Sequence, residues 1–113
     1  MAVPANTCVY EISGPMFFAA AEKILDISVK EDTKVLVIRM RSVNAIDATA
    51  MHNLEQLLED CETKHVKVVL SHVNEQPMRV MEKAGMVTRV GRENFCDHID
   101  EALKRAGELT STE

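Results

Sequence analysis

The sequence lacks tryptophan, and aromatic residues make up only 4% of its 113 residues. Any core must therefore be filled by aliphatic side chains, by alanine and by the seven methionines. Glycine is also scarce, with four residues, and neither G-x-G-x-x-G nor G-x-x-x-x-G-K-[ST] occurs. Because these glycine patterns let the backbone approach a phosphate group closely, their absence argues against a dinucleotide or P-loop site.

A disulfide framework is lacking as well. Cys8, Cys61 and Cys96 form an odd number with no C-x-x-C pair, which predicts free thiols in a reducing compartment rather than disulfides. No apolar run approaches the roughly 18 residues of a membrane-spanning helix, and the first residues lack the basic and apolar regions of a secretory signal. These absences predict a domain that is soluble when isolated, does not insert into a membrane and stays inside the cell.

Positive charge is in the minority. Lysine and arginine number 13 against 18 aspartate and glutamate residues, which gives a net charge of −5 at pH 7. Such a chain has no long-range attraction for nucleic acid or for an anionic lipid surface. Length and composition predict one globular domain over residues 1–113, with a core at about residues 8–106 and a polar tail at residues 107–113.

Strand and helix patterns alternate along the chain. Predicted strands cover residues 8–13, 35–40, 66–71 and 86–90, and predicted helices cover residues 15–27, 51–61, 75–84 and 95–106. Gly85 follows the end of the third helix, while Asn94 and Gly107 are the expected cap and stop of the last one. This order predicts an α/β fold with a largely parallel sheet covered by about four helices.

Candidate catalytic and metal-binding groups are poorly arranged for chemistry. The histidines lie on separate predicted elements without the spacing of a metal site, at His52, His65, His72 and His98. Cys96 and His98 would point away from each other on a helix, so they do not predict a thiol–imidazole pair. No catalytic residue and no metal ligand is therefore predicted, although a small enzyme or nucleotide-binding protein using the sheet crevice stays open as a weaker alternative.

The loops that follow the predicted central strands are the best candidates for a binding site. In an open parallel sheet the crevice lies beyond the carboxyl ends of the strands, where residues 41–50 and 72–76 would meet. Within the first loop, Asp47 is placed to cap the next helix by accepting a backbone N–H. Thr49 is then either an incidental residue of the first turn or a phosphorylation site, and the same helix start could bind a free anion.

Three segments resemble the STAS domain, which is shared by anti-sigma factor antagonists and by the cytoplasmic carboxyl-terminal part of sulfate permease (SulP) transporters. They are YEISGPMFFAAAEKI at residues 10–24, VLVIRMRSVNAIDATAMHNLEQL at 35–57 and EKAGM at 82–86. The GPMFFA part is similar to the transporter branch. The resemblance covers about residues 8–106 and implies the STAS (anti-sigma factor antagonist-like) fold, with a mixed or mostly parallel sheet of four or five strands and no catalytic centre.

The resemblance to SulP transporters implies a regulatory domain on the cytoplasmic side of the inner or plasma membrane, as part of a larger membrane protein. Its expected partners are the transporter's membrane domain and cytosolic regulatory proteins, and a weak homodimer is a further possibility. No cofactor is expected beyond weak nucleotide or anion binding. The contact residues implied are Asn44, Asp47, Thr49, Ala50, His72 and Asn74. Phe17 and Phe18 belong either to the core or, if exposed, to a docking patch for the membrane domain.

The alternative reading is a free-standing anti-sigma factor antagonist. In that branch the turn before the helix carries a hydroxyl that a partner kinase phosphorylates, and Thr49 occupies the corresponding position. Ala48 and Ala50 stand where that turn usually has serine and glycine. The resemblance therefore implies a contact surface first and a phosphorylation switch at Thr49 as the alternative.

Overall fold

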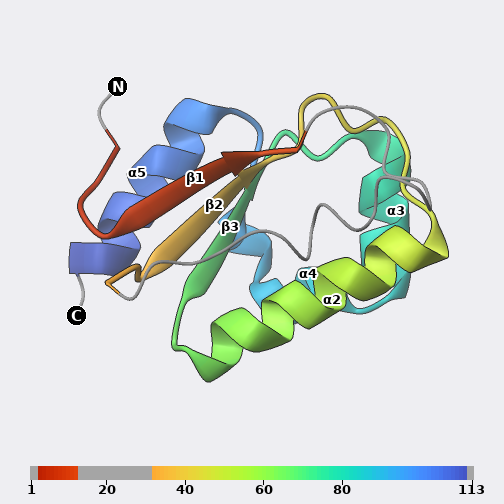
Figure 1. The fold of residues 1–113 in the computed structure, drawn as a ribbon. Coiled ribbons are helices and arrows are strands. Elements are labelled where there is room, and N and C mark those ends of the chain that lie inside the picture. Colours follow the sequence, from red (N-terminus) through yellow and green to blue (C-terminus); the bar gives the residue numbers. More distant parts are fainter. Residues whose placement is uncertain (1–2, 13–31, 112–113) are drawn as a thin grey trace.

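The computed structural model describes residues 3–12 and 32–111 (Figure 1). Its sheet contains β1 (Thr7–Glu11), β2 (Val35–Arg39), β3 (Lys67–Ser71) and β4 (Phe95–Cys96), in the order β1-β2-β3-β4. All three pairings are parallel, with Leu36 opposite Cys8 and Val68 and with Leu70 opposite Phe95. The predicted parallel α/β sheet is therefore confirmed. The predicted helix at residues 15–27, with Phe17 and Phe18, lies outside the described residues.

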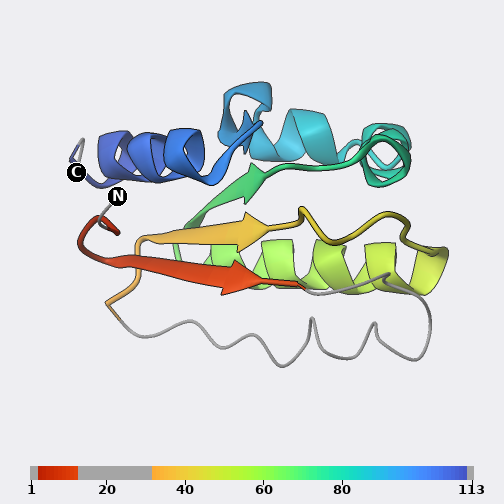
Figure 2. The ribbon, with the colours of Figure 1, turned by 90° about the horizontal axis from the view of Figure 1, so that it is seen from above.

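Helices cover both faces of this sheet (Figures 1 and 2). They are α2 (Ala48–Thr63), α3 (Glu75–Lys83), α4 (Met86–Val90) and α5 (Ile99–Ser111), with a 3-10 turn at Arg92–Asn94 between α4 and β4. Because side chains alternate along a strand, Leu36 and Ile38 face α2 while Val35 and Val37 face α5. The near-continuous burial of β2 is what a strand covered on both faces requires.

Helix α3 begins and ends where the sequence predicts. Pro77 lies in its first turn, where a missing N–H costs nothing, and Gly85 follows its end with φ of 77°. A side chain at Gly85 would meet nothing within 4 Å, so glycine is used there for its left-handed backbone rather than for space.

Two predictions about the last third of the chain were wrong. Residues 86–90 form helix α4 rather than a strand, because Gly85 turns the chain and places Met86 and Val87 in the core beside α2. The fourth strand is instead Phe95–Cys96, inside the segment predicted as the start of the last helix. That strand has two residues, which is too short for alternation to be visible in a sequence.

The last helix also differs from its predicted bounds. Asn94 does not cap it: its side chain is buried, donates to the Val90 carbonyl at 2.8 Å and accepts from Arg105 Nε at 2.8 Å. Helix α5 begins at Ile99 and continues through Gly107 to Ser111. Within the described residues, no helix combines the length and the apolar character that crossing a bilayer demands.

Candidate functional site

The two loops predicted to meet at the carboxyl edge of the sheet are joined by side chains from the start of α3. Asn74 Nδ2 donates to the carbonyls of Val43 at 2.8 Å and Arg41 at 3.2 Å. Gln76 accepts from the Ile46 N–H at 2.9 Å and donates to the Ile46 carbonyl at 3.1 Å. These four hydrogen bonds hold the β2–α2 loop, residues 40–47, against α3.

The start of α2 is capped as the sequence predicts. Asp47 has an extended backbone, its Oδ1 accepts from the Ala50 N–H at 2.9 Å, and its carbonyl accepts from the Met51 N–H at 2.9 Å. Ala50 is buried beneath the cap, whereas Thr49 is exposed in the first turn. The Asp47 carboxylate therefore already occupies one of the N–H groups that an added phosphate would use.

The structure divides the six candidate contact residues into two groups. Asn44, in the β2–α2 loop, and Thr49, in the first turn of α2, are exposed. The start of α2 lies beyond the carboxyl ends of the strands (Figure 2). Asn74 does not belong to the exposed surface of the β2–α2 loop, because its side chain donates to the loop carbonyls. His72 instead lines a hollow on the α5 side of the sheet edge. The six residues thus do not form a single site.

This hollow, called here the carboxyl-end hollow, has a volume of about 360 Å³. Its lining comes from the ends of β2 and β3 and from the start of α5: Arg39, Arg41, Ser71, His72, His98, Ile99 and Asp100. His72 is held at φ of 54° while its N–H donates to the Cys96 carbonyl at 2.8 Å. The rings of His72 and His98 approach edge to face, with their centroids 6.4 Å apart.

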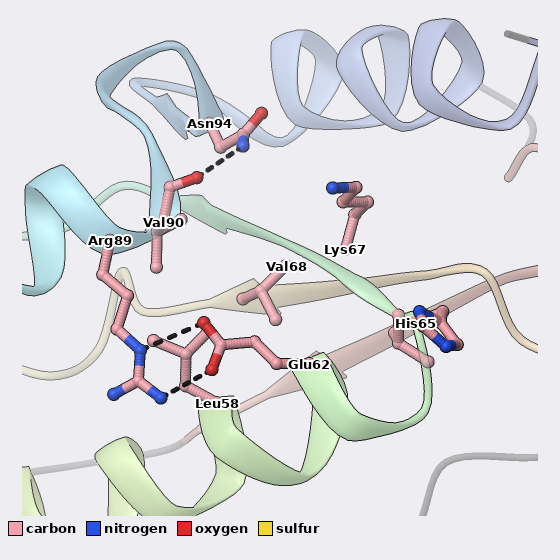
Figure 3. Close-up of a pocket in the computed structure, with 9 residues that line it drawn as sticks. Leu58, Glu62, His65, Lys67, Val68, Arg89, Val90 and Asn94 are labelled. Atoms are coloured by element: carbon pink, nitrogen blue, oxygen red, sulfur yellow. Dashed lines mark hydrogen bonds and ion pairs between the residues drawn. The ribbon is translucent and has the colours of Figure 1, made fainter.

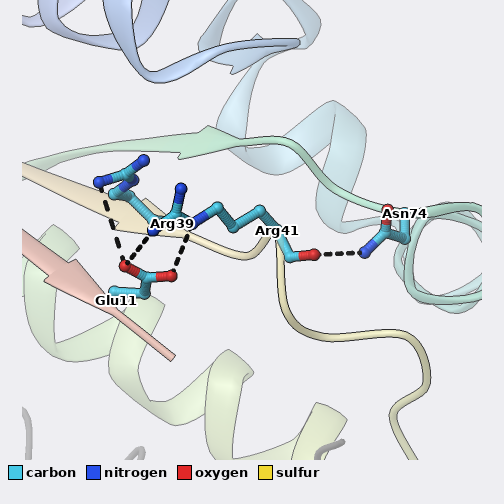
Figure 4. A network of polar contacts seen from close by, with 4 residues as sticks. All are labelled: Glu11, Arg39, Arg41 and Asn74. Atoms are coloured by element: carbon cyan, nitrogen blue, oxygen red, sulfur yellow. Dashed lines mark hydrogen bonds and ion pairs between the residues drawn. The ribbon is translucent and has the colours of Figure 1, made fainter. Parts of the chain in front are cut away.

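Two arginines at one side of the carboxyl-end hollow share the carboxylate of Glu11, at the end of β1 (Figure 4). Arg41 Nε lies 2.8 Å from Glu11 Oε2, and Arg39 Nη1 lies 4.0 Å from Oε1. The hydrogen bond from Arg41, helped by the charges of both arginines, holds the pKa of Glu11 below its ordinary value. Because Asn74 binds the Arg41 carbonyl, both ends of this residue are fixed.

A second hollow of about 350 Å³ lies near the amino end of β3, between α2 and α4 (Figure 3). Its main charged groups pair with each other, since Arg89 Nη2 and Nε contact the two Glu62 oxygens at 2.6 Å and 3.0 Å. The hydrogen bond from Arg89 lowers the pKa of Glu62. The ion pair closes one side of this amino-end hollow, whose lining also includes Lys67.

Sequence reasoning missed most of the carboxyl-end hollow. Arg39 gave a usable signal, because a charge directly after four buried aliphatic residues marks the end of a strand where a crevice opens. Glu11 and Gln76 gave none, since their partners lie 30 residues away along the chain. Among the described residues, no group of three or more His, Cys, Asp or Glu could hold a metal ion.

Comparison with known proteins identifies the family. The STAS domain model matches residues 1–102. A solved structure of a sulfate transporter family protein from Wolinella succinogenes is 38% identical in sequence, with a TM-score of 0.88. The match covers 98% of this chain and 93% of the Wolinella chain. The STAS domain of a SulP transporter from Vibrio cholerae is 30% identical, with a TM-score of 0.83, and covers 99% of this chain and 89% of its own.

Curated relatives are much longer than this chain. A Bacillus subtilis protein whose name assigns it to sulfate transport is 27% identical over 99 residues, which make up 85% of this chain and 19% of that protein. The chain thus spans less than a fifth of this relative. It belongs to the STAS domain family, and its relatives include the STAS domains of SulP transporters.

Proposed function

We propose that this chain is a non-catalytic regulatory and interaction module of a SulP-type anion transporter, on the cytoplasmic side of the membrane and in contact with the transporter's membrane domain. The observation that carries the proposal is the pattern of coverage. Nearly the whole chain matches a solved SulP STAS domain, whereas it matches only 19% of a longer protein named for sulfate transport.

The proposed contact surface is the exposed part of the β2–α2 loop and the first turn of α2, represented by Asn44 and Thr49. The clamp from Asn74 and Gln76 supports this choice, because it fixes the loop before any partner arrives. A preorganised surface loses less conformational entropy on binding than a mobile one. In this arrangement Asp47 stabilises the surface as a helix cap, and buried Ala50 supports it without touching a partner.

The first test is genetic. Continuing the reading frame upstream of Met1 in the source genome should reveal several apolar segments of about 20 residues, each long enough to span a bilayer. A reading frame without such segments would refute the transporter module and leave the free-standing alternative.

The second test addresses the contact surface in the full gene product. Thr49→Arg should lower the uptake of labelled sulfate at least threefold at equal surface abundance, because a long charged side chain blocks a close contact there. Thr88→Arg is the matched control, since Thr88 is also an exposed helical threonine but lies on α4. Equal uptake by both variants would reject this surface.

The alternative function, a phosphorylation-switched anti-sigma factor antagonist, is favoured only by the exposure of Thr49 in the first turn of α2. A phosphate there would be stabilised by the helix N-terminus and repelled by Asp47. Incubation with anti-sigma kinases and ATP, followed by intact-mass measurement, tests it. The alternative requires a phosphate-sized mass gain that disappears in Thr49→Val, and an unchanged mass rejects it.

A further inference from the structure

The edge of β3 that faces β4 is paired over only part of its length. β4 begins at Phe95 and meets β3 from Leu70 onward, at the carboxyl end of β3. Just before β4 the chain forms a 3-10 turn, in which the Asn94 N–H donates to the Gly91 carbonyl at 3.0 Å. Because the turn uses this N–H, the pairing stops there. Within the part of the chain that the structure describes, residues 67–69 therefore have no neighbouring strand on this side.

The backbone groups of Val68 point toward this unpaired edge. In a parallel sheet, the N–H and C=O groups of successive residues point to opposite sides of a strand. The Lys67 N–H donates to the Lys34 carbonyl at 2.9 Å, on the β2 side, whereas the His72 N–H donates to the Cys96 carbonyl at 2.8 Å, on the β4 side. Val68 has the same orientation as His72. Its N–H and C=O groups therefore lie on the side where no strand of the described residues reaches.

The amino-end hollow of about 350 Å³ lies at this unpaired edge, since Val68 lines it (Figure 3). At about 30 Å³ for each non-hydrogen atom, as in liquid water, this space holds about a dozen such atoms. The backbone of three residues contains about 12 non-hydrogen atoms. The hollow is therefore of the size needed for a short strand beside residues 67–69.

One face of the hollow is apolar. Val68 and Leu58 belong to the core cluster between the sheet and α2, and the partly buried Val90 packs against the same cluster. All three side chains line the hollow. Because side chains alternate across a strand, a strand placed beside Val68 would direct every second side chain toward this apolar face.

The other face of the hollow carries a positive charge. Lys67 lies next to Val68 in β3, so its side chain takes the opposite face of the sheet. It is exposed, and its ammonium group forms no ion pair with the described residues. Glu62 and Arg89 pair with each other and cancel. With His65 neutral, these three charged groups leave the lining with one positive charge, that of Lys67.

We propose that the amino-end hollow binds an extended acidic peptide, which adds a short strand to the unpaired edge of β3, in line with β4. The peptide backbone pairs with the N–H and C=O groups of Val68. Its apolar side chains lie against Leu58 and Val90, and its alternating acidic side chains lie beside Lys67. This surface is at the opposite end of the strands from the β2–α2 loop proposed to contact the transporter, so either surface can fail without the other.

Amide hydrogen exchange of the isotope-labelled chain tests the unpaired edge without a ligand. The N–H of Val68 should exchange at least tenfold faster than that of Val69, which points to β2. Slow exchange at Val68 that persists on dilution would show that another part of the chain covers the edge. Slow exchange that becomes fast on dilution would show that a second copy covers it. Either result would overturn the proposal.

The ligand test is an NMR titration with the capped peptide acetyl-EVEVE-amide, whose valines and glutamates alternate as the two faces require. Amide shifts of Val68, Leu70 and Asn94 should change and saturate, and exchange at Val68 should slow at least fivefold in the complex. The same peptide with its three central nitrogens methylated should bind at least fivefold more weakly, because it keeps the side chains and loses backbone donors. Equal binding of the two peptides, non-saturating shifts, or shifts confined to β1 at the other edge of the sheet would overturn the proposal.

A charge reversal tests the choice of an acidic peptide. Lys67→Glu should weaken the binding of acetyl-EVEVE-amide at least threefold and should strengthen that of acetyl-KVKVK-amide. Lys64→Glu is the matched control, because Lys64 is also exposed, lies three residues away and does not line the hollow. A Lys67→Glu variant that folds normally and keeps the preference of the wild type for the acidic peptide would contradict the proposal, as would an equal effect of Lys64→Glu.

Discussion

The clamp between Gln76 and Ile46 offers the sharpest test of the loop geometry. Replacing Gln76 by alanine removes two neutral hydrogen bonds, at 2.9 Å and 3.1 Å, between its side-chain amide and the Ile46 backbone. Each such bond contributes about 1 kcal/mol, and a buried group left unpaired costs about 1–3 kcal/mol. Since Ile46 is only 2% exposed, water replaces the lost amide poorly, and we expect a loss of about 2–3 kcal/mol.

Urea unfolding followed by far-ultraviolet circular dichroism suits this measurement, because the chain has no tryptophan to report by fluorescence. With a slope of about 2 kcal/mol per molar urea, a loss of about 2–3 kcal/mol should lower the midpoint of Gln76→Ala by about 1–1.5 M. Gln56→Ala is the matched control: Gln56 is exposed on α2, and among the described residues its side chain hydrogen-bonds to His52 alone, so the midpoint of this variant should change little. Amide hydrogen exchange at Ile46 should also accelerate in Gln76→Ala alone.

The reasoning would be refuted if Gln76→Ala and Gln56→Ala shifted the midpoint equally, within the roughly 0.5 kcal/mol expected for surface changes. A Gln76→Ala variant of normal stability but with rapid exchange at Ile46 would lead to a different conclusion. The Gln76 side chain would then order the loop without adding to the free energy of global unfolding.

Three further predictions concern the cap, two glycines and a buried thiol. Asp47→Ala should lower the free energy of unfolding by about 1 kcal/mol, whereas Asp47→Asn should be nearly neutral because asparagine also caps, and urea unfolding measures both. Gly85→Ala should destabilise the fold by about 1–2 kcal/mol because residue 85 has a φ of 77°. Gly107→Ala, inside the helix α5, should stabilise it by about 0.5–1 kcal/mol. Thermal unfolding measures both, and changes of the same sign in the two variants would contradict this prediction. Burial raises the pKa of Cys61 to about 11, so its thiol contributes stability that is complete below the unfolded thiol pKa and is lost as pH rises toward 11. In native buffer Cys61 should therefore be alkylated after Cys8, by mass spectrometry of timed samples, and rapid labelling of native Cys61 would show that its helix opens readily.

Local chemistry made most of the described fold up to Gly85 predictable. The buried run of β2, the Asp47 cap and the positive-φ Gly85 each depend on neighbouring residues, so the sequence shows them directly. Helix α4 could not be recognised in this way. Its valines and threonine favour a strand, and only the packing of Met86 and Val87 in the core overrides that preference.

The same distinction between short-range and long-range contacts applies to the candidate site. Asp47 was predictable because its partner N–H lies three residues away. The carboxyl-end hollow was not, because Glu11 and Arg41 are separated by 30 residues and His72 meets His98 only through the pairing of β3 with β4. Contacts of this kind depend on sheet order, which hydrophobic periodicity does not reveal.

The order β1-β2-β3-β4 also bears on how the chain acquires its fold during translation. Each described strand pairs with the strand that precedes it along the chain, so no later strand has to be inserted between two that are already paired. The ribosome releases the chain from its amino end, so each new strand can pair with the edge strand of the sheet that has already formed. Strand pairs that form early are therefore kept when the next strand is added. The carboxyl-end hollow is then completed last, when α5 emerges.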